Sequence, residues 1–365
     1  MSQRPRLIGS EIYRRSRYGG KHPLAIPRVS AALDLIRALG WLDAEDYVDS
    51  PVASPGQLAR FHDRDYIQAV IEAEARQDAP DEVRQRHGIG VNGNPVFGEI
   101  FARPATACGA TLKAVDLLAN GGIVHSPAGG THHGRPDRAS GFCYFNDPAL
   151  GILAFLDRGI SPILYIDIDA HHGDGVEDAF IGEPRVSTVS IHEAGRWPGT
   201  GIAHRPEEDI WNFPVPPGFN DSELKAIFEA VVLPLANKLR PQAIVLQGGA
   251  DALLEDPLSK LALSNQVYWW VVEQVRPLAP RLLVLGGGGY NPWSVARCWT
   301  GIWGTIVGAD IPQTLPEAAR AVLRDLSWSR TPRHPPEHWL TTLADRPRDG
   351  DVRSPVSKMI EQTEI

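Results

Sequence analysis

The densest group of residues capable of chemistry lies at residues 165–175, which read YIDIDAHHGDG. The segment begins as an apolar strand, and Asp167, Asp169 and His171 then alternate, so they share one face if the strand persists. Two carboxylates and an imidazole at a strand end predict a divalent-metal site whose mixed oxygen and nitrogen donors suit zinc or ferrous iron. The alternative is a polar loop with an N-capping aspartate for a helix that starts near Val176.

A histidine pair offers a general base. His132 and His133 are adjacent in the glycine-rich sequence GGTHHG, after an apolar run at residues 123–126. Glycines let a turn approach a ligand closely, and histidine is the usual proton acceptor near neutral pH. Asp167 and Asp174 are available to orient the two imidazoles. The alternative is a turn with one exposed and one packed histidine.

Two more polar groups follow apolar runs. Asp251, in QGGAD, offers a second carboxylate to the metal or an N-cap for the next helix. Tyr290 follows four glycines and either donates its hydroxyl to a carbonyl oxygen or packs its ring on a flexible turn. A metal with open positions, a histidine base and a tyrosine donor together predict metal-assisted hydrolysis of an amide or ester.

The elements that must position these residues are short strands alternating with helices. Apolar runs predict buried strands at residues 123–126, 163–166, 186–191, 243–246 and 282–285. Helical spacing appears at residues 27–39, 224–239 and 258–275, with one further helix at 316–326. This alternation predicts an α/β fold with a mostly parallel sheet and helices on both faces. Ligands bind outside the carboxyl ends of such strands, where the polar groups lie.

Composition fits one large globular domain. The chain has 365 residues, of which 43% are hydrophobic, and no linker interrupts residues 1–308. Residues 309–365, rich in proline and charge, predict a C-terminal extension that packs on the domain or frays. A net charge of −8 argues against direct nucleic-acid binding, and no apolar run is long enough to span a membrane. Three scattered cysteines and the absence of an apolar signal core favour a cytoplasmic location. No oligomeric state follows.

The sequence resembles the histone deacetylase family, which has the arginase/deacetylase fold, and is more narrowly similar to bacterial acetoin-utilisation-type deacetylases. The motifs GGTHHGRPDRASGFCYFND, YIDIDAHHGDGVEDAF, LQGGAD and LGGGGYN carry the resemblance in the family's order. It covers residues 6–308 and is weaker in the tail.

The resemblance implies a role for each candidate residue. Asp169, His171 and Asp251 match the metal ligands, although Asp167 was equally eligible from the sequence alone. By the family's pairings, Asp167 is the partner of His132 and Asp174 is the partner of His133. The resemblance implies that His133 is the general base and then the general acid, whereas His132 has a mainly electrostatic role. Tyr290 matches the tyrosine that stabilises the transition state. The implied substrate-binding residues are Gly141, Phe142, Trp197, Leu258 and Gly288, with Arg28 in an inner acetate-release channel. Trp197 stands where phenylalanine is common, and its larger ring is expected to narrow or reshape the acyl-lysine tunnel.

The resemblance also implies two structural potassium ions. One would bind Asp167, Asp169, His171, Ser190 and Ile191, and the other the carbonyls of Phe180, Glu183 and Val186. One departure concerns the rim, where many relatives hold the substrate backbone with an aspartate. The stretch GVNGNP at residues 90–95 contains asparagines instead, and an amide cannot accept two charge-assisted bonds from backbone N–H groups.

We therefore expect a zinc-dependent deacetylase, with ferrous iron possible, that removes an acetyl or similar group from acylated lysine of a protein. An amidohydrolase acting on acetylpolyamines or other small acylated amines is the first alternative. A non-catalytic acyl-lysine-binding module is the second, which intact Tyr290, His132 and His133 disfavour. An arginase-like ureohydrolase is disfavoured because it needs ligands for two bridged metals.

Overall fold

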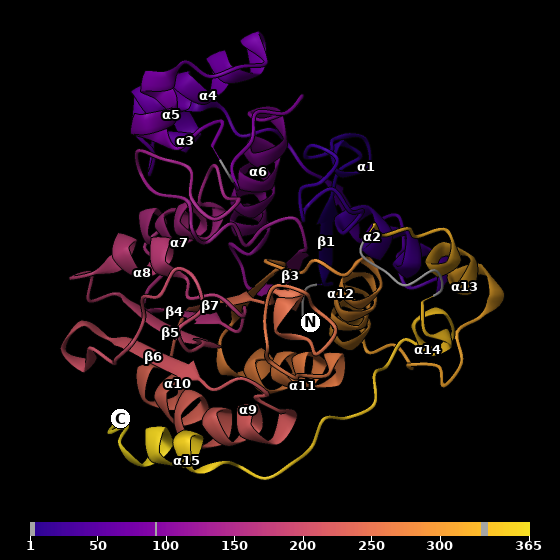
Figure 1. Cartoon of the computed structure of the whole chain (residues 1–365). Helices are drawn as coiled ribbons and strands as arrows, with labels where there is room; N and C mark the ends of the chain where they lie inside the picture. The colour runs from indigo at the N-terminus through magenta and orange to yellow at the C-terminus, as the bar shows by residue number, and fades with distance from the viewer. Residues whose placement is uncertain (1–3, 92, 330–334) are drawn as a thin grey trace.

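A computed structural model describes residues 4–91, 93–329 and 335–365 (Figure 1). The described residues form an eight-stranded sheet in the order β2-β1-β3-β8-β7-β4-β5-β6, in which every neighbouring pair is parallel. The strands are β1 (Arg6–Gly9), β2 (Tyr47–Asp49), β3 (Gly122–Ser126), β4 (Ile163–Asp167), β5 (Val186–Glu193), β6 (Ile210–Val215), β7 (Ala243–Gln247) and β8 (Arg281–Leu285).

Helices fill the connections between these strands. In the first half of the chain they are α1 (Ile12–Arg15), α2 (Val29–Ala38), α3 (Pro55–Leu58), α4 (Arg64–Arg76), α5 (Asp81–His87), α6 (Ala102–Leu117), α7 (Asp147–Asp157) and α8 (Asp174–Phe180). In the second half they are α9 (Asp221–Ile227), α10 (Leu233–Leu239), α11 (Asn265–Val275), α12 (Pro292–Val307), α13 (Glu317–Arg324), α14 (Glu337–Thr341) and α15 (Ser354–Glu361). A π-helical turn, η2 (Phe228–Val232), joins α9 to α10, and the 3₁₀ turns are η1 (Pro206–Glu208), η3 (Ala250–Ala252) and η4 (Arg276–Leu278).

The two faces of the sheet bury different cores. In β4, Leu164 and Ile166 face a core built with α2, α9, α10, α11 and α12, whereas Ile163 and Tyr165 face a core built with α6, α7 and α8. Successive strand residues point to opposite faces, so a strand buried on both faces must be apolar throughout. This explains the short apolar runs in the sequence and confirms the predicted architecture.

The five predicted strands are confirmed, and three further strands were not predicted. β2 and β6 lie at the two edges of the sheet, and β1 lies next to β2. Their sequences lack a clear apolar run because they are short or carry polar residues; β6 contains Asn212 and Pro214. Proline is tolerated in a strand mainly at a sheet edge.

The predicted helices are largely confirmed, with one wrong boundary. The helix expected at residues 258–275 begins at Asn265, because the preceding residues form a loop held by carboxylates. Asp256 accepts the N–H of Leu258, and Asp221 accepts both the N–H and the hydroxyl of Ser264. This loop places Leu258 beside the site described below.

The C-terminal segment packs on the body of the molecule. After α14 the chain passes beneath α11 and α9 in the view of Figure 1 and ends in α15. Arg297 of α12 is fully buried and pairs with Asp345 at 2.6 Å, and Arg353 pairs with the buried Glu223 of α9. No described helix is long and apolar enough to cross a membrane.

Candidate active site

The polar clusters meet at the carboxyl edge of the sheet. Asp167 is the last residue of β4 and lies in register with Ser190 of β5 and Gln247 of β7. The strand ends at Asp167, so the condition under which Asp167, Asp169 and His171 would share one of its faces is not met. A loop brings them together instead: Asp167 accepts the N–H of Asp169, and Asp169 accepts the N–H of His171.

Asp169, His171 and Asp251 form a buried group whose donor atoms all lie within 4.8 Å of one another. His171 Nδ1 lies 2.9 Å from Asp251 Oδ2 and 3.3 Å from Asp169 Oδ1. Burial lowers the pKa of His171, but Asp251 and Asp169 outweigh it and raise the pKa to about 10. Two carboxylates and an imidazole are donors that suit a divalent cation, which on binding would take the place of the proton on His171. Asp167 is not part of this group.

Glycines let the backbone close around the two carboxylates. The N–H of Gly288 donates to Asp169 Oδ2 at 2.7 Å. A Cβ at Gly288 would lie 2.5 Å from Asp251 Cγ, and one at Gly249 would lie 2.5 Å from Asp169 Cγ. Both positions therefore need glycine for steric reasons, and Gly288 supports the two carboxylates as well as lining the inner cavity.

The histidine pair is held by two separate carboxylates. His132 Nδ1 lies 2.8 Å from Asp167 Oδ2, and His133 Nδ1 lies 2.7 Å from Asp174 Oδ1, as the resemblance implies. Both rings are buried, and their centroids are 3.9 Å apart. Each carboxylate fixes the orientation of one ring, and His132 Nε2 then lies 3.8 Å from Asp169 Oδ1.

The turn before the pair is anchored by Asp147, a residue that the sequence reasoning missed. Asp147 accepts the N–H groups of Gly130 and Thr131 and the hydroxyl of Thr111. Asp147 is the last residue of the sequence motif CYFND and the first residue of α7, directly after the N-cap Asn146. That motif was the sequence signal that could have identified it.

The two histidines differ in electrostatics. Burial lowers the pKa of His132, but Asp167 and Asp169 raise it to about 9 overall. Burial and the neighbouring charge on His132 lower the pKa of His133 to about 3, against the opposing effect of Asp174. His132 is therefore the protonated, cationic member of the pair near neutral pH, and His133 is neutral. A neutral imidazole is the state that a general base requires.

Tyr290 is placed by the glycine turn and by Asp256. Gly287 and Gly289 have φ values of +135° and +127°, which only glycine adopts readily. The N–H of Tyr290 donates to Asp256 Oδ2 at 2.6 Å, a contact that the sequence did not suggest. Burial and the nearby Asp251 and Asp169 raise the pKa of Tyr290 well above 10, so its hydroxyl keeps its proton and can donate.

The outer pocket is a cavity of about 380 Å³ that ends at His133, His171 and Tyr290. Its walls include Gly93, Gly141, Phe142, Arg196, Trp197 and Leu258. Trp197 is 49% exposed and packs its ring edge-on to His133 with centroids 4.7 Å apart. Gly141, Phe142, Trp197 and Leu258 therefore surround one opening, whereas Gly288 lines the inner cavity.

The rim loop at residues 90–95 is described only in part, because Asn92 lies outside the described residues. Asn94 is buried, and its Oδ1 accepts the N–H of Phe142 at 2.9 Å. Asn94 thus supports a tunnel wall rather than facing the opening.

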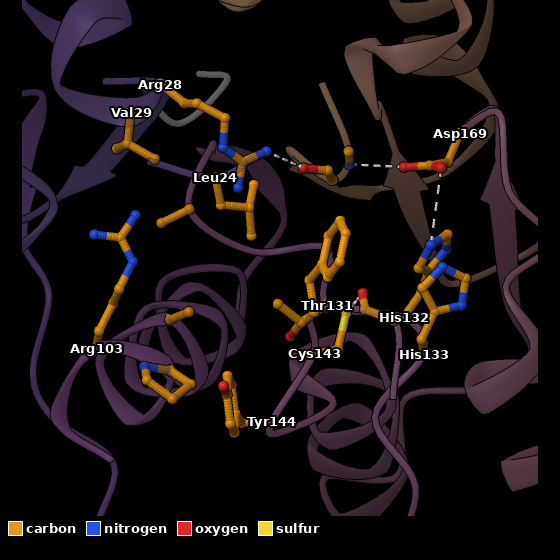
Figure 2. Close-up of a pocket in the computed structure, with 18 of the residues that line it drawn as sticks. Leu24, Arg28, Val29, Arg103, Thr131, His132, His133, Cys143, Tyr144 and Asp169 are labelled. Carbon is orange, nitrogen blue, oxygen red and sulfur yellow. Dashed lines mark hydrogen bonds and ion pairs between the residues drawn. The ribbon is translucent and has the colours of Figure 1, made fainter. Parts of the chain in front are cut away.

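A second cavity continues inward from the reacting groups (Figure 2). It is lined by His132, His133, Asp169 and Tyr290 at one end and by Leu24, Arg28 and Arg103 further in. Arg28 Nη1 donates to the carbonyl of Gly287 at 2.6 Å, beside the turn that carries Tyr290. Arg103 did not emerge from the sequence as a site residue.

Among the residues implied for potassium, Asp169 and His171 belong to the buried group itself, and the others lie in or next to β4, α8 and β5. Asp167 and Ser190 are neighbours on β4 and β5, and Ile191 follows on β5. Phe180, Glu183 and Val186 form successive turns, since the N–H of Glu183 donates to Phe180 and that of Val186 to Glu183.

A parallel sheet with a carboxylate–imidazole donor set, two oriented histidines and a tyrosine at its carboxyl edge is the arrangement expected of a metal-dependent hydrolase. Comparison with known proteins is more specific. The histone deacetylase domain model matches residues 22–306.

The acetoin utilization protein AcuC of Bacillus subtilis is 34% identical over 325 residues, which cover 85% of this chain and 84% of that protein. Histone deacetylase 8 of Xenopus tropicalis is 36% identical over 303 residues, with 80% of each chain covered. The crystal structure of a histone deacetylase homologue from Aquifex aeolicus superimposes with a TM-score of 0.94 at 36% identity and covers 99% of both chains.

The chain belongs to the histone deacetylase family. It is accordingly a metal-dependent deacetylase with that family's fold.

Proposed function

We propose that the protein uses zinc to remove an acetyl or similar short acyl group from the side chain of a protein lysine. The observation that carries this proposal is that His171, which lies in a buried group with Asp169 and Asp251, lines the same cavity as His133 and Tyr290. The outer cavity has an aromatic wall and suits the neutral, unbranched stem of an acylated lysine. The carboxylate and imidazole donors also suit ferrous iron, so the metal in the cell is a matter for measurement.

The chain's own residues divide the chemistry. Asp169, His171 and Asp251 would hold the ion, which when bound polarises the acyl carbonyl and lowers the pKa of water. Neutral His133, fixed by Asp174, takes the proton of the attacking water and later gives a proton to the leaving amine. His132, charged and paired with Asp167, stabilises negative charge, and the Tyr290 hydroxyl donates to the developing oxyanion.

The test is Tyr290→Phe in the zinc-loaded protein, assayed on an acetyl-lysine peptide. Loss of one oxyanion donor should lower kcat by about 100- to 1,000-fold while zinc content stays unchanged. Tyr66→Phe is the matched control, because Tyr66 is buried, donates its hydroxyl to the carbonyl of Tyr144 and lines neither cavity. Unchanged turnover in Tyr290→Phe would refute the assigned role.

A small acylated amine such as an acetylpolyamine is the second candidate substrate. It is favoured by the rim, where Asn94 is engaged by Phe142 and no aspartate occurs at residues 90–95. Equal assays of acetyl-lysine peptides and acetylated polyamines separate the two. A protein that binds zinc and hydrolyses neither would be a binding module.

Other assignments complete the proposal. Potassium would bind at Asp167, Asp169, His171, Ser190 and Ile191, and at the carbonyls of Phe180, Glu183 and Val186. Residues 1–308 would form the catalytic domain, with residues 309–365 as an extension packed on it through Arg297 and Arg353. The protein would act in the cytoplasm.

A further inference from the structure

The inner cavity contains two arginines and too few acids to balance them. Arg28 and Arg103 both line it, and among its described lining residues Asp169 is the sole acid, already engaged by His171. No ion pair joins either arginine to a carboxylate in the parts of the chain that the structure describes. Figure 2 shows the Arg28 side chain reaching beside Leu24 toward the side of Asp169, and Arg103 on the side of Leu24 away from His132 and His133.

Each guanidinium is held in place without being neutralised. Arg28 donates to the carbonyl of Gly287 and lies 5.4 Å above the Trp299 ring. Arg103 donates to the carbonyl of Ser16 at 2.9 Å and lies 5.0 Å from the Tyr13 ring. One carbonyl and an aromatic face orient a guanidinium but leave most of its five N–H donors unused.

The two positive charges act on each other. Burial is the main cause that lowers the pKa of Arg28; Tyr290 and Asp251 oppose it, and the charge on Arg103 adds to it. Arg103 is only 8% exposed. Placing two like charges in one enclosed space is unfavourable unless an anion joins them, and a planar carboxylate matches the guanidinium fork.

We propose that this cavity is a carboxylate subsite for the far end of the acyl chain, so that the enzyme also hydrolyses short dicarboxylic acyl groups such as succinyl from lysine. The inference rests on the proposed function and names a substrate class for it. The family resemblance places Arg28 in a channel for the released acid; Arg103 adds a second cation, which a one-charge product such as acetate does not require. An acyl carbonyl held at the metal end directs the rest of its chain into this cavity.

The reaction remains a hydrolysis. The water oxygen bonds to the acyl carbon, the C–N bond breaks, and the amine leaves with a proton. The acyl group departs as a dicarboxylate, here succinate, and no oxidant or further reactant is consumed.

The experiment compares three peptides on the zinc-loaded full chain: acetyl-lysine, succinyl-lysine and succinamyl-lysine, the last with a neutral amide in place of the far carboxylate. The succinyl peptide should exceed the succinamyl peptide in kcat/KM by at least about tenfold, as expected for a charge-assisted contact. Arg103→Met should abolish that ratio, and Arg103→Lys should retain part of it. Arg76→Met, an exposed arginine of α4 paired with Glu72, removes the same charge elsewhere and should keep the ratio.

A measurement without a variant guards against misfolding of Arg103→Met. Succinate should inhibit hydrolysis of the acetyl peptide by the unaltered protein at a concentration at least about tenfold lower than succinamate. If the acetyl peptide is hydrolysed but succinyl is not favoured over succinamyl, or if Arg103→Met keeps the preference, the carboxylate subsite is refuted while the proposed function stands. If no acylated lysine is hydrolysed by the zinc-loaded protein, the proposed function fails first.

Discussion

Replacing Gly288 with alanine should disturb the metal centre through one methyl group. The added Cβ would lie 2.5 Å from Asp251 Cγ and 2.9 Å from Asp169 Oδ2. Ordinary contacts need about 3.5 Å, so the carboxylates or the turn must move by roughly an ångström. The turn cannot retreat freely, because the N–H of Gly288 bonds Asp169 and the carbonyl of Gly288 accepts the N–H of Ala250.

A displacement of that size in a catalytic centre costs about 100-fold in rate, equivalent to about 2.7 kcal/mol of transition-state stabilisation. We therefore expect kcat/KM on an acetyl-lysine peptide to fall about 100-fold, together with weaker zinc retention on dialysis. Gly98→Ala is the matched control, since its Cβ would meet no atom within 4 Å. A Gly288→Ala protein with full zinc and normal turnover would refute the close-approach argument.

Three more predictions follow from contacts around the site and in the core. The Asp256→Asn variant keeps one acceptor oxygen for the two N–H groups of Tyr290 and Leu258. We therefore expect kcat to fall about tenfold while zinc content stays unchanged. An unchanged kcat would show that Asp256 does not position Tyr290. The Asp345→Ala variant leaves Arg297 buried without its ion-pair partner. Urea titration should then show a loss of about 3–5 kcal/mol in the free energy of unfolding. A loss below about 1 kcal/mol would show that this contact of the extension adds little to stability. Chelation should lower the Tm, and added zinc should restore it, because an ion that binds only the folded state stabilises it; a Tm indifferent to chelation would count against the site.

The fold could be predicted from the sequence wherever burial on both faces imposed an apolar run. β4 and β7 are examples, and every residue in both strands is buried. The edge strand β2 escaped prediction because it has no fully buried residue, whereas β6 is mostly buried but its apolar run is interrupted by Asn212 and Pro214. The start of α11 was missed because the loop before it is held by Asp221 and Asp256, which are distant in sequence from some of their partners.

The site could be predicted in outline but not in its division of labour. Asp167 and Asp169 occupy alternating positions in the sequence, so either could be read as a metal ligand. In the structure, Asp167 ends β4 and contacts His132, whereas Asp169 lies in the following loop with His171 and Asp251. Arg103 resembles an ordinary surface arginine of a helix in the sequence. It is buried only because the N-terminal segment carrying Tyr13 and Ser16 folds over it, a tertiary contact that no local pattern encodes.

The central claim is that one divalent cation sits among Asp169, His171 and Asp251. An anomalous-difference map of crystals of the zinc-loaded protein, recorded on both sides of the zinc absorption edge, tests it most directly. We expect a single strong peak within bonding distance of all three side chains, with open coordination facing the outer cavity. A fully active crystal whose zinc peak lies elsewhere, or whose three side chains bind each other with no peak between them, would contradict it.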